Sequence, residues 1–234
     1  MYKSATLEEF LAPISARLGR ETVPETIEKL QVSALVPPHV TDGLTFSELL
    51  DRFCEEAVKV RVNIHRCKAD EVAGIVASIV EEGEGDKVIF ADDRRIDSMG
   101  IVEALQPVAS SLVRWDGTKD RDECIAEADA ANFGITFPLQ AIAETGSIVQ
   151  PCDTHCGRAV SLLPKTHIAL IDASTMVSSM RDSLRSIEAA GGENGENLPS
   201  QIVFIDGPSA TSDIELVRVE GVHGPMFEHY ILFE

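Results

Sequence analysis

Apolar residues recur at every third or fourth position in two segments of the first sixty residues. In the first segment this face consists of Leu7, Phe10, Leu11, Ile14 and Leu18. In the second, Phe46 to Val60, it consists of Leu49, Leu50, Phe53 and Ala57. The spacing predicts two amphipathic helices, and the proline-containing stretch between them is expected to be extended. We therefore predict an N-terminal helical arm over residues 1–59.

From Val60 onward, short apolar runs of strand length alternate with amphipathic runs of helical length. Strands are expected at 60–65, 87–91, 112–115, 133–137, 141–142, 146–149, 167–172, 201–206, 214–219 and 229–233, and helices at 69–82, 96–109, 120–131 and 174–190. This alternation is typical of a parallel sheet covered by helices. We predict an α/β domain over residues 60–234 with a mostly parallel sheet flanked by helices, whose last strands form mixed or antiparallel pairs.

The charge of the chain narrows the choice of partners. The 234 residues include 20 Lys and Arg against 39 Asp and Glu, a formal net charge of −19. Such a chain repels phosphate backbones and anionic lipid headgroups, so nucleic acid and membrane partners are not expected. From Ser186 onward Arg218 is the only basic residue. An anionic ligand held there would have to rely on backbone N–H groups.

The first residues and the cysteines indicate the compartment. The N-terminal ten residues contain Lys3, Glu8 and Glu9 and no apolar segment of signal-peptide type. No uncharged apolar run approaches the ~18 residues of a membrane span. The five cysteines are an odd number and are expected to be reduced thiols. We expect a cytoplasmic protein without membrane insertion.

Common enzyme fingerprints are missing. The strand expected at 87–91 runs into two aspartates and two arginines instead of a glycine-rich turn, so it offers no dinucleotide or P-loop site. A GxSxG nucleophile elbow is also absent. The sequence identifies no cofactor, and candidate chemistry has to come from the loops at the ends of the expected strands.

The first such loop is Ala143 to Gly146, between two short apolar strands. Glu144 here lies next to the hydroxyl of Thr145 and could act as a base or nucleophile with a raised pKa. The same pattern also fits a hairpin acid that bonds to its local backbone, and both interpretations stay open.

Two further loops follow later strands. Between Gly207 and Glu215, the hydroxyls of Ser209 and Thr211 surround backbone donors that can hold an oxyanion, although such a turn is also common loop chemistry. His223 lies in the loop Gly221 to Pro225, where its imidazole is either placed for proton transfer or merely exposed.

A fourth group combines thiols with an imidazole. Cys152, His155 and Cys156 could begin a soft-metal site, but the second ligand pair that structural zinc requires is not evident, so no metal is assigned. His167, which opens an apolar strand, is interpreted as a core or sheet-edge residue.

Taken together, four segments in order resemble one known family. They are AIAETGSIV at 141–149, RAVSLLPKTHIALI at 158–171, GPSATSDIE at 207–215 and GVHGP at 221–225. The succession resembles the C-terminal half of the lactate utilization protein C family, also called LUD-domain proteins, over residues 129–234. The resemblance implies an α/β fold like that of ribose-5-phosphate isomerase and the CoA transferases. It also implies a part in bacterial L-lactate oxidation to pyruvate beside iron–sulfur partner proteins.

Carried over residue by residue, the resemblance implies a strand-end cleft for a small organic anion or cofactor. Its catalytic candidates are Glu144 as base or nucleophile, His223 as proton shuttle, and Asp213. Its ligand-binding candidates are Thr145, Gly146, Arg158 as a carboxylate anchor, Gly207, Ser209, Thr211, Glu215 and Gly224. The chain departs from the family pattern at Ala210 and Met226, neutral residues where a polar or basic one is often found, and at His155 and Cys156.

Two hypotheses about function remain at this point. In the first, which is the leading one, the strand-end cleft binds a small anion or cofactor and gives the chain a chemical step of its own. In the second, the chain is a non-catalytic accessory subunit that docks on an iron–sulfur oxidoreductase and supports it. The missing cofactor fingerprints and the neutral residues at 210 and 226 favour the second hypothesis.

Overall fold

The computed structural model describes residues 6–23, 39–192, 195–212 and 218–234. The chain divides into two compact units, Met1–Pro38 and His39–Glu234. The described helix of the first unit is α1 (Leu7–Arg17), as the apolar spacing predicted. The Thr6 hydroxyl accepts a hydrogen bond from the N–H of Glu9, whose carboxylate accepts from the N–H of Thr6. This capping box fixes the start of the helix.

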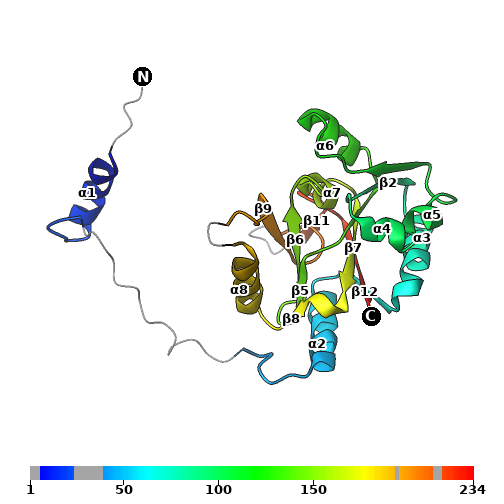
Figure 1. Ribbon diagram of the computed structural model, residues 1–234, viewed down its shortest axis with the longest axis horizontal. Helices are drawn as coiled ribbons and strands as arrows, with labels where there is room; N and C mark the ends of the chain where they lie inside the picture. The colour runs from blue at the N-terminus through cyan, green and yellow to red at the C-terminus, as the bar shows by residue number, and fades with distance from the viewer. Residues whose placement is uncertain (1–5, 24–38, 193–194, 213–217) are drawn as a thin grey trace. The chain divides into compact units, whose positions relative to one another are not determined.

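The second unit is built on a six-stranded sheet in the order β1-β12-β7-β4-β2-β3, in which every neighbouring pair is parallel. Figure 1 labels β2, β7 and β12 of this sheet. The strands are β1 (Asn63–Cys67), β2 (Lys87–Phe90), β3 (Ser111–Arg114), β4 (Phe133–Thr136), β7 (Thr166–Asp172) and β12 (Phe227–Phe233). The predicted α/β fold with a mostly parallel sheet is confirmed.

The expected antiparallel or mixed pairing of the last strand is wrong. β12 lies parallel between β1 and β7. The N–H of Met226 bonds to the carbonyl of Lys165, so β12 begins at the same edge of the sheet as β7. The other expected late strand, 214–219, falls largely on residues outside the described part of the chain, and its described end, Arg218 and Val219, pairs antiparallel as expected.

A second, four-stranded sheet has the order β8-β5-β6-β9. Its strands are β5 (Gln140–Ile142), β6 (Ser147–Cys152), β8 (Met176–Val177) and β9 (Gln201–Ile205). β5 pairs with β8 in parallel, and the other pairs are antiparallel. A short hairpin of β10 (Ala210–Ser212) and β11 (Arg218–Glu220) follows.

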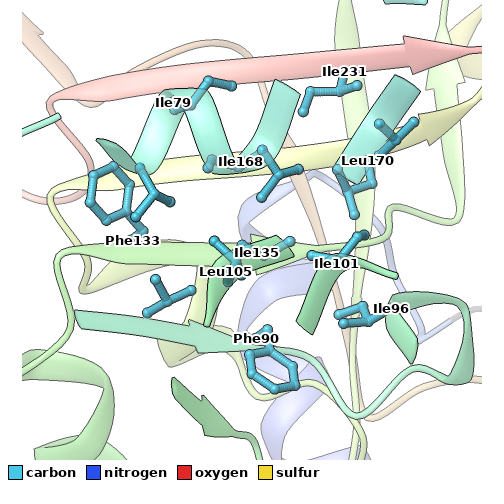
Figure 2. Close-up of a cluster of buried hydrophobic side chains, with 14 of the residues drawn as sticks. Ile79, Phe90, Ile96, Ile101, Leu105, Phe133, Ile135, Ile168, Leu170 and Ile231 are labelled. Atoms are coloured by element: carbon cyan, nitrogen blue, oxygen red, sulfur yellow. The ribbon is translucent and has the colours of Figure 1, made fainter. Parts of the chain in front are cut away.

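One face of the six-stranded sheet is covered by three helices. They are α3 (Val72–Glu82), which follows the 3-10 turn η1 (Ala69–Glu71), α4 (Arg94–Ser98) and α5 (Ile101–Leu105). Their apolar side chains and those of the sheet form a large buried cluster, in which Ile101 and Leu105 of α5 lie beside Ile135 of the sheet (Figure 2). The single helix predicted at 96–109 is broken into α4 and α5 because Gly100 adopts a left-handed φ of +69°.

The opposite face carries α2 (Phe46–Lys59), α6 (Arg121–Asp129), α7 (Arg158–Leu162) and the second sheet. Against that second sheet packs α8 (Met180–Ala190), through Ile187. The sequence predicted this helix from Ser174. It begins later because η2 (Ala173–Thr175) and β8 intervene and the Ser179 hydroxyl accepts from the N–H of Asp182, capping the helix.

Helix α2 packs on the sheet of the second unit. Leu50, Phe53 and Ala57 are buried, and the ring of Phe53 stacks on Tyr230 of β12 with centroids 5.8 Å apart. The sequence assigned this helix to the N-terminal arm, whereas the compact second unit begins at His39. β1 begins at Asn63, later than predicted, because Val60 caps α2 and Arg61 has a φ of 69°.

No helix among the described residues has the length and apolar character needed to cross a membrane.

Candidate functional site

Glu144 lies in the tight turn that joins β5 to β6. The backbone N–H of Glu144 donates to the carbonyl of Ser178, which ties the turn to the segment before α8. Gly146 has a φ of +71°, and a Cβ there would lie 2.3 Å from the backbone N of Ala57 in α2. The turn therefore needs glycine at this position, because no side chain fits between it and the helix.

The carboxylate of Glu144 pairs with an imidazole that sequence reasoning missed. Nδ1 of His39 lies 2.9 Å from Oε1 of Glu144, and the two side chains are 20% and 23% exposed. Nε2 of His39 is buried and has no hydrogen-bond partner among the described residues. The residues are 105 positions apart, so no local pattern could reveal the pair.

A carboxylate at the start of α8 lies close to this pair. Hydrogen bonds from Ser179 lower the pKa of Asp182, and smaller contributions come from Ser178 and from the charges of Arg185 and His39. The surroundings of His39 therefore contain two carboxylates, those of Glu144 and Asp182.

Ser147 connects Thr145 to the residue before the turn Gly207–Pro208–Ser209, called the GPS turn below. The hydroxyl of Ser147 is 2.8 Å from that of Thr145 and 3.4 Å from Oδ1 of Asp206. Gly207 has a φ of +78°, and a Cβ there would lie 2.6 Å from the carbonyl oxygen of Val60. Gly146 and Gly207 thus both lie against the end of α2, which brings together two motifs that are far apart in the sequence.

The loop Gly221–Pro225, called the histidine loop below, contacts the GPS turn at Ser209. The backbone N–H of His223 donates to the hydroxyl of Ser209, 3.2 Å away, and the N–H of Ser209 donates to the carbonyl of Pro225. A Cβ at Gly224 would lie 3.2 Å from that of Ser209. The imidazole of His223 is exposed, as is Thr211 in β10. Asp213 and Glu215 lie outside the described residues.

Arg158 lies elsewhere, at the start of α7, and lines a cavity of ≈ 1010 Å³. The residues around this cavity include Lys119 and Arg121 but not Glu144, Ser209 or His223. The structure therefore joins the Glu144 turn, the GPS turn and the histidine loop, and it places the proposed carboxylate anchor in a separate cavity.

A buried polar chain crosses the space between the two sheets. His167 of β7 has Nδ1 2.5 Å from Oε1 of Glu228 in β12, and Nε2 2.8 Å from the hydroxyl of Thr136 in β4. The Thr136 hydroxyl donates to Oε1 of Gln150 in β6, 2.7 Å away. All four side chains are buried. The interpretation of His167 as a core residue matches its burial, but its partners were missed because the predicted last strand began after Glu228.

The hydrogen bonds in this row of buried polar side chains show that Nε2 of His167 carries a proton. The amide nitrogen of Gln150 donates to the carbonyl of Pro151, so its oxygen accepts from Thr136. The Thr136 oxygen must then accept from Nε2–H of His167. The remaining proton lies between Nδ1 and Glu228, and burial raises the pKa of Glu228 while His167 opposes that shift. The pair carries no net charge in either arrangement of that proton.

The cysteine group does not form a ligand cluster. Cys156 is buried, and burial raises its pKa far above the usual value. The His155 side chain is exposed and lies 3.2 Å from Oδ2 of Asp92. Across the described parts of the chain, no three His, Cys, Asp or Glu side chains gather as metal ligands would.

Comparisons with known proteins place these features in a family. Residues 50–233 match the family model of the LUD domain. "Lactate utilization protein C 1" of Bacillus mycoides (strain KBAB4) is 34% identical over 97% of this chain and 96% of its own. "Lactate utilization protein C" of Halalkalibacterium halodurans is 32% identical over 97% of both chains.

A solved structure has the same fold. The crystal structure of a DUF162 family protein from Deinococcus radiodurans superimposes with a TM-score of 0.59, at 22% identity, over 82% of this chain and 100% of that chain.

Proposed function

Because this chain belongs to the LUD domain family, we propose that it takes part in the oxidation of L-lactate to pyruvate together with iron–sulfur partner proteins. Relatives named lactate utilization protein C match nearly the whole chain and nearly their own whole length. A shared role in lactate utilization is the simplest reading of similarity at that coverage.

The pairing of His39 with Glu144 supports a chemical step in this chain. Oxidation of L-lactate to pyruvate releases protons as well as electrons. Iron–sulfur partners would take the electrons, and an acid–base pair would take a proton. A carboxylate that accepts Nδ1–H holds an imidazole in one tautomer and leaves Nε2 to accept a proton. Glu144 thus positions His39, and His223 is a second candidate for proton transfer.

The turns around this pair form the proposed frame of the site. Gly146 and Gly207 let the Glu144 turn and the GPS turn approach the end of α2. Thr145 and Ser209 contribute hydroxyls, and Gly224 packs against Ser209. In this proposal the frame holds a small organic anion close to the acid–base pair.

Growth on lactate tests the proposal. A strain that lacks the native gene is complemented with the wild-type gene or with Glu144→Gln, His39→Gln or Glu103→Gln, and growth with L-lactate as the only carbon source is measured. Glu103 is an exposed glutamate on α5 and serves as the matched control. We expect Glu144→Gln and His39→Gln to slow growth strongly at equal protein levels, and Glu103→Gln to grow like wild type.

The same strains separate the two hypotheses. If the deletion abolishes growth and both site variants restore it fully, the acid–base role is wrong and a non-catalytic accessory role remains. Purification of the tagged full chain from lactate-grown cells then tests the partners. Iron–sulfur proteins that co-purify support both forms of the proposal, and their absence from cells that grow on lactate contradicts the partner assignment.

A further inference from the structure

The cavity of ≈ 1010 Å³ around Arg158 lies where loops leave several strands. Trp115 follows β3 directly, and Leu139 lies between β4 and β5. Gly157 and Arg158 follow β6 and begin α7. Helices α6 and α7, which pack on each other, supply further walls. Ligands of open α/β sheets collect at this kind of position, beyond the carboxyl ends of the strands.

The cavity wall gathers cationic side chains in a chain that is otherwise strongly acidic. Three cationic side chains line it, those of Lys119, Arg121 and Arg158, beside the carboxylates of Asp153 and Glu196. Lys119 is paired with Glu127 and Glu123. Among the described residues, Arg121 and Arg158 form no ion pair. In a chain with a net charge of −19, two arginines of one cavity that have no ion pair within the described residues are available to bind an anion.

The rest of the wall is largely apolar. Leu139, Leu162 and Ile125 line it with Trp115, the one tryptophan of the chain. The indole packs where Gly157 has no side chain, since a Cβ there would lie 2.0 Å from Cζ2 of the ring. The indole Nε1 is buried and has no hydrogen-bond partner among the described residues. An aromatic and aliphatic wall suits a planar ligand.

The size of the cavity points to a ligand larger than lactate. Lactate would occupy on the order of 100 Å³, a few times the share of a water molecule, against the ≈ 1010 Å³ of the cavity. We propose that this cavity binds a planar phosphate ester of nucleotide size, with its phosphate on Arg121 and Arg158 and its planar part against the wall of Trp115, Leu139 and Leu162. The site is separate from the Glu144–His39 pair and does not rest on the proposed lactate function.

Two matched ligand pairs test the proposal with the full chain. Flavin mononucleotide is compared with riboflavin, and adenosine diphosphate with adenosine, because the members of each pair share the planar part and differ in phosphate. Binding is followed through the fluorescence of Trp115. We expect at least one phosphate ester to change this fluorescence with saturation, and its phosphate-free partner to bind about tenfold or more weakly.

Variants locate the binding. Arg121→Gln and Arg158→Gln should each weaken binding of the phosphate ester about tenfold and leave binding of its phosphate-free partner unchanged. Arg94→Gln, an exposed arginine on α4, is the matched control and should bind like wild type. Leu139→Ser, which alters a half-exposed wall residue, should weaken binding of the phosphate ester and of its phosphate-free partner by the same factor. Circular dichroism checks that each variant is folded.

Three results would overturn the proposal. The first is no fluorescence change with either phosphate ester at millimolar concentration. The second is equal binding of a phosphate ester and its phosphate-free partner. The third is a loss of binding in Arg94→Gln as large as that in Arg158→Gln, which would mean that the chain binds anions through overall charge only.

Discussion

Glu228 of β12 and His167 of β7 form a pair between adjacent strands of the six-stranded sheet, with Oε1 and Nδ1 2.5 Å apart and side chains that are 1% and 0% exposed. A full charge separation buried this deeply is costly, because desolvation exceeds what a single partner returns. The second carboxyl oxygen, Oε2, has no hydrogen-bond partner among the described residues, which makes the ionised carboxylate less favourable still. The pair is best understood as a neutral, proton-sharing link between β7 and β12.

This view predicts that Glu228→Gln is much milder than Glu228→Ala. The glutamine amide can donate to Nδ1 of His167 while Nε2–H still bonds to Thr136, so we expect a loss of about 1 kcal/mol in the free energy of unfolding. Alanine leaves Nδ1 unpaired beside a new void, and we expect a loss of about 3 kcal/mol or more. Urea unfolding of the two variants measures the difference. Equal losses would show that the carboxylate charge itself is needed.

Two histidines that stack on each other make the stability of the protein depend on pH. His229 of β12 stacks on His65 of β1, with ring centroids 5.4 Å apart. Burial first, and then the charge of His65, lower the pKa of His229 to about 4. In the unfolded chain this residue has a pKa near 6.5. Between about pH 6.5 and pH 4, His229 is therefore protonated in the unfolded chain and neutral in the folded chain. The stability is therefore full above about pH 6.5 and falls as the pH is lowered towards 4.

His229→Gln should remove part of this loss. Between pH 7 and pH 4.5 we expect the wild type to lose about 1–2 kcal/mol more unfolding free energy than the variant, after allowance for the partial exposure of the ring. His223→Gln, at an exposed histidine, is the control and should follow the wild type. A variant that loses as much stability as the wild type would place the acid sensitivity elsewhere.

The turn at Gly146 predicts a position-specific glycine effect. Gly146→Ala combines a left-handed φ of +71° with a contact of 2.3 Å to the backbone of Ala57, so we expect it to cost about 2 kcal/mol or more. Gly74→Ala lies in the exposed interior of α3 with nothing within 4 Å of the added carbon. It should stabilise the protein by about 0.5–1 kcal/mol. Thermal unfolding of both variants measures the two changes in stability. An unchanged stability of Gly146→Ala would contradict the prediction.

The cysteines should react in a fixed order. Burial raises the pKa of Cys156 far above that of Cys54 or Cys67, which are only partly buried and have smaller upward shifts from the same cause. Thiolates are the reacting species, so iodoacetamide at pH 8 should alkylate Cys54 and Cys67 well before Cys156. Mass spectrometry of peptides from briefly treated native protein gives the order. Early alkylation of Cys156 would contradict its buried placement.

Most of the fold follows from local pattern. The apolar spacing of α1, α2 and α3, and the short apolar runs of β2, β4 and β7, all appear close to where the sequence places them. Side-chain periodicity and capping are local, because a residue's neighbours at three, four or two positions decide which face it joins. Errors occur where a backbone detail intervenes, such as Gly100 in the middle of a predicted helix.

The position of β12 could not be read from the sequence in the same way. Its apolar run predicts a strand, but parallel pairing with both β1 and β7 depends on the path of the loop before Met226. The same applies to α2, whose pattern gives a helix but does not show that Phe53 packs on Tyr230. Pairing and packing depend on residues far apart in the chain, and a single sequence does not state which ones meet.

For the candidate site, too, some features follow from the sequence and others only from the tertiary structure. The sequence by itself determined the family, the α/β class and the residue types that could carry chemistry, because these depend on ordered motifs and local periodicity. Only the tertiary structure decided that Glu144 meets His39, that Gly146 and Gly207 share the end of α2, and that Arg158 faces another cavity. Side chains become partners through the crossing of strands and helices, and that crossing is set by the burial of the whole core.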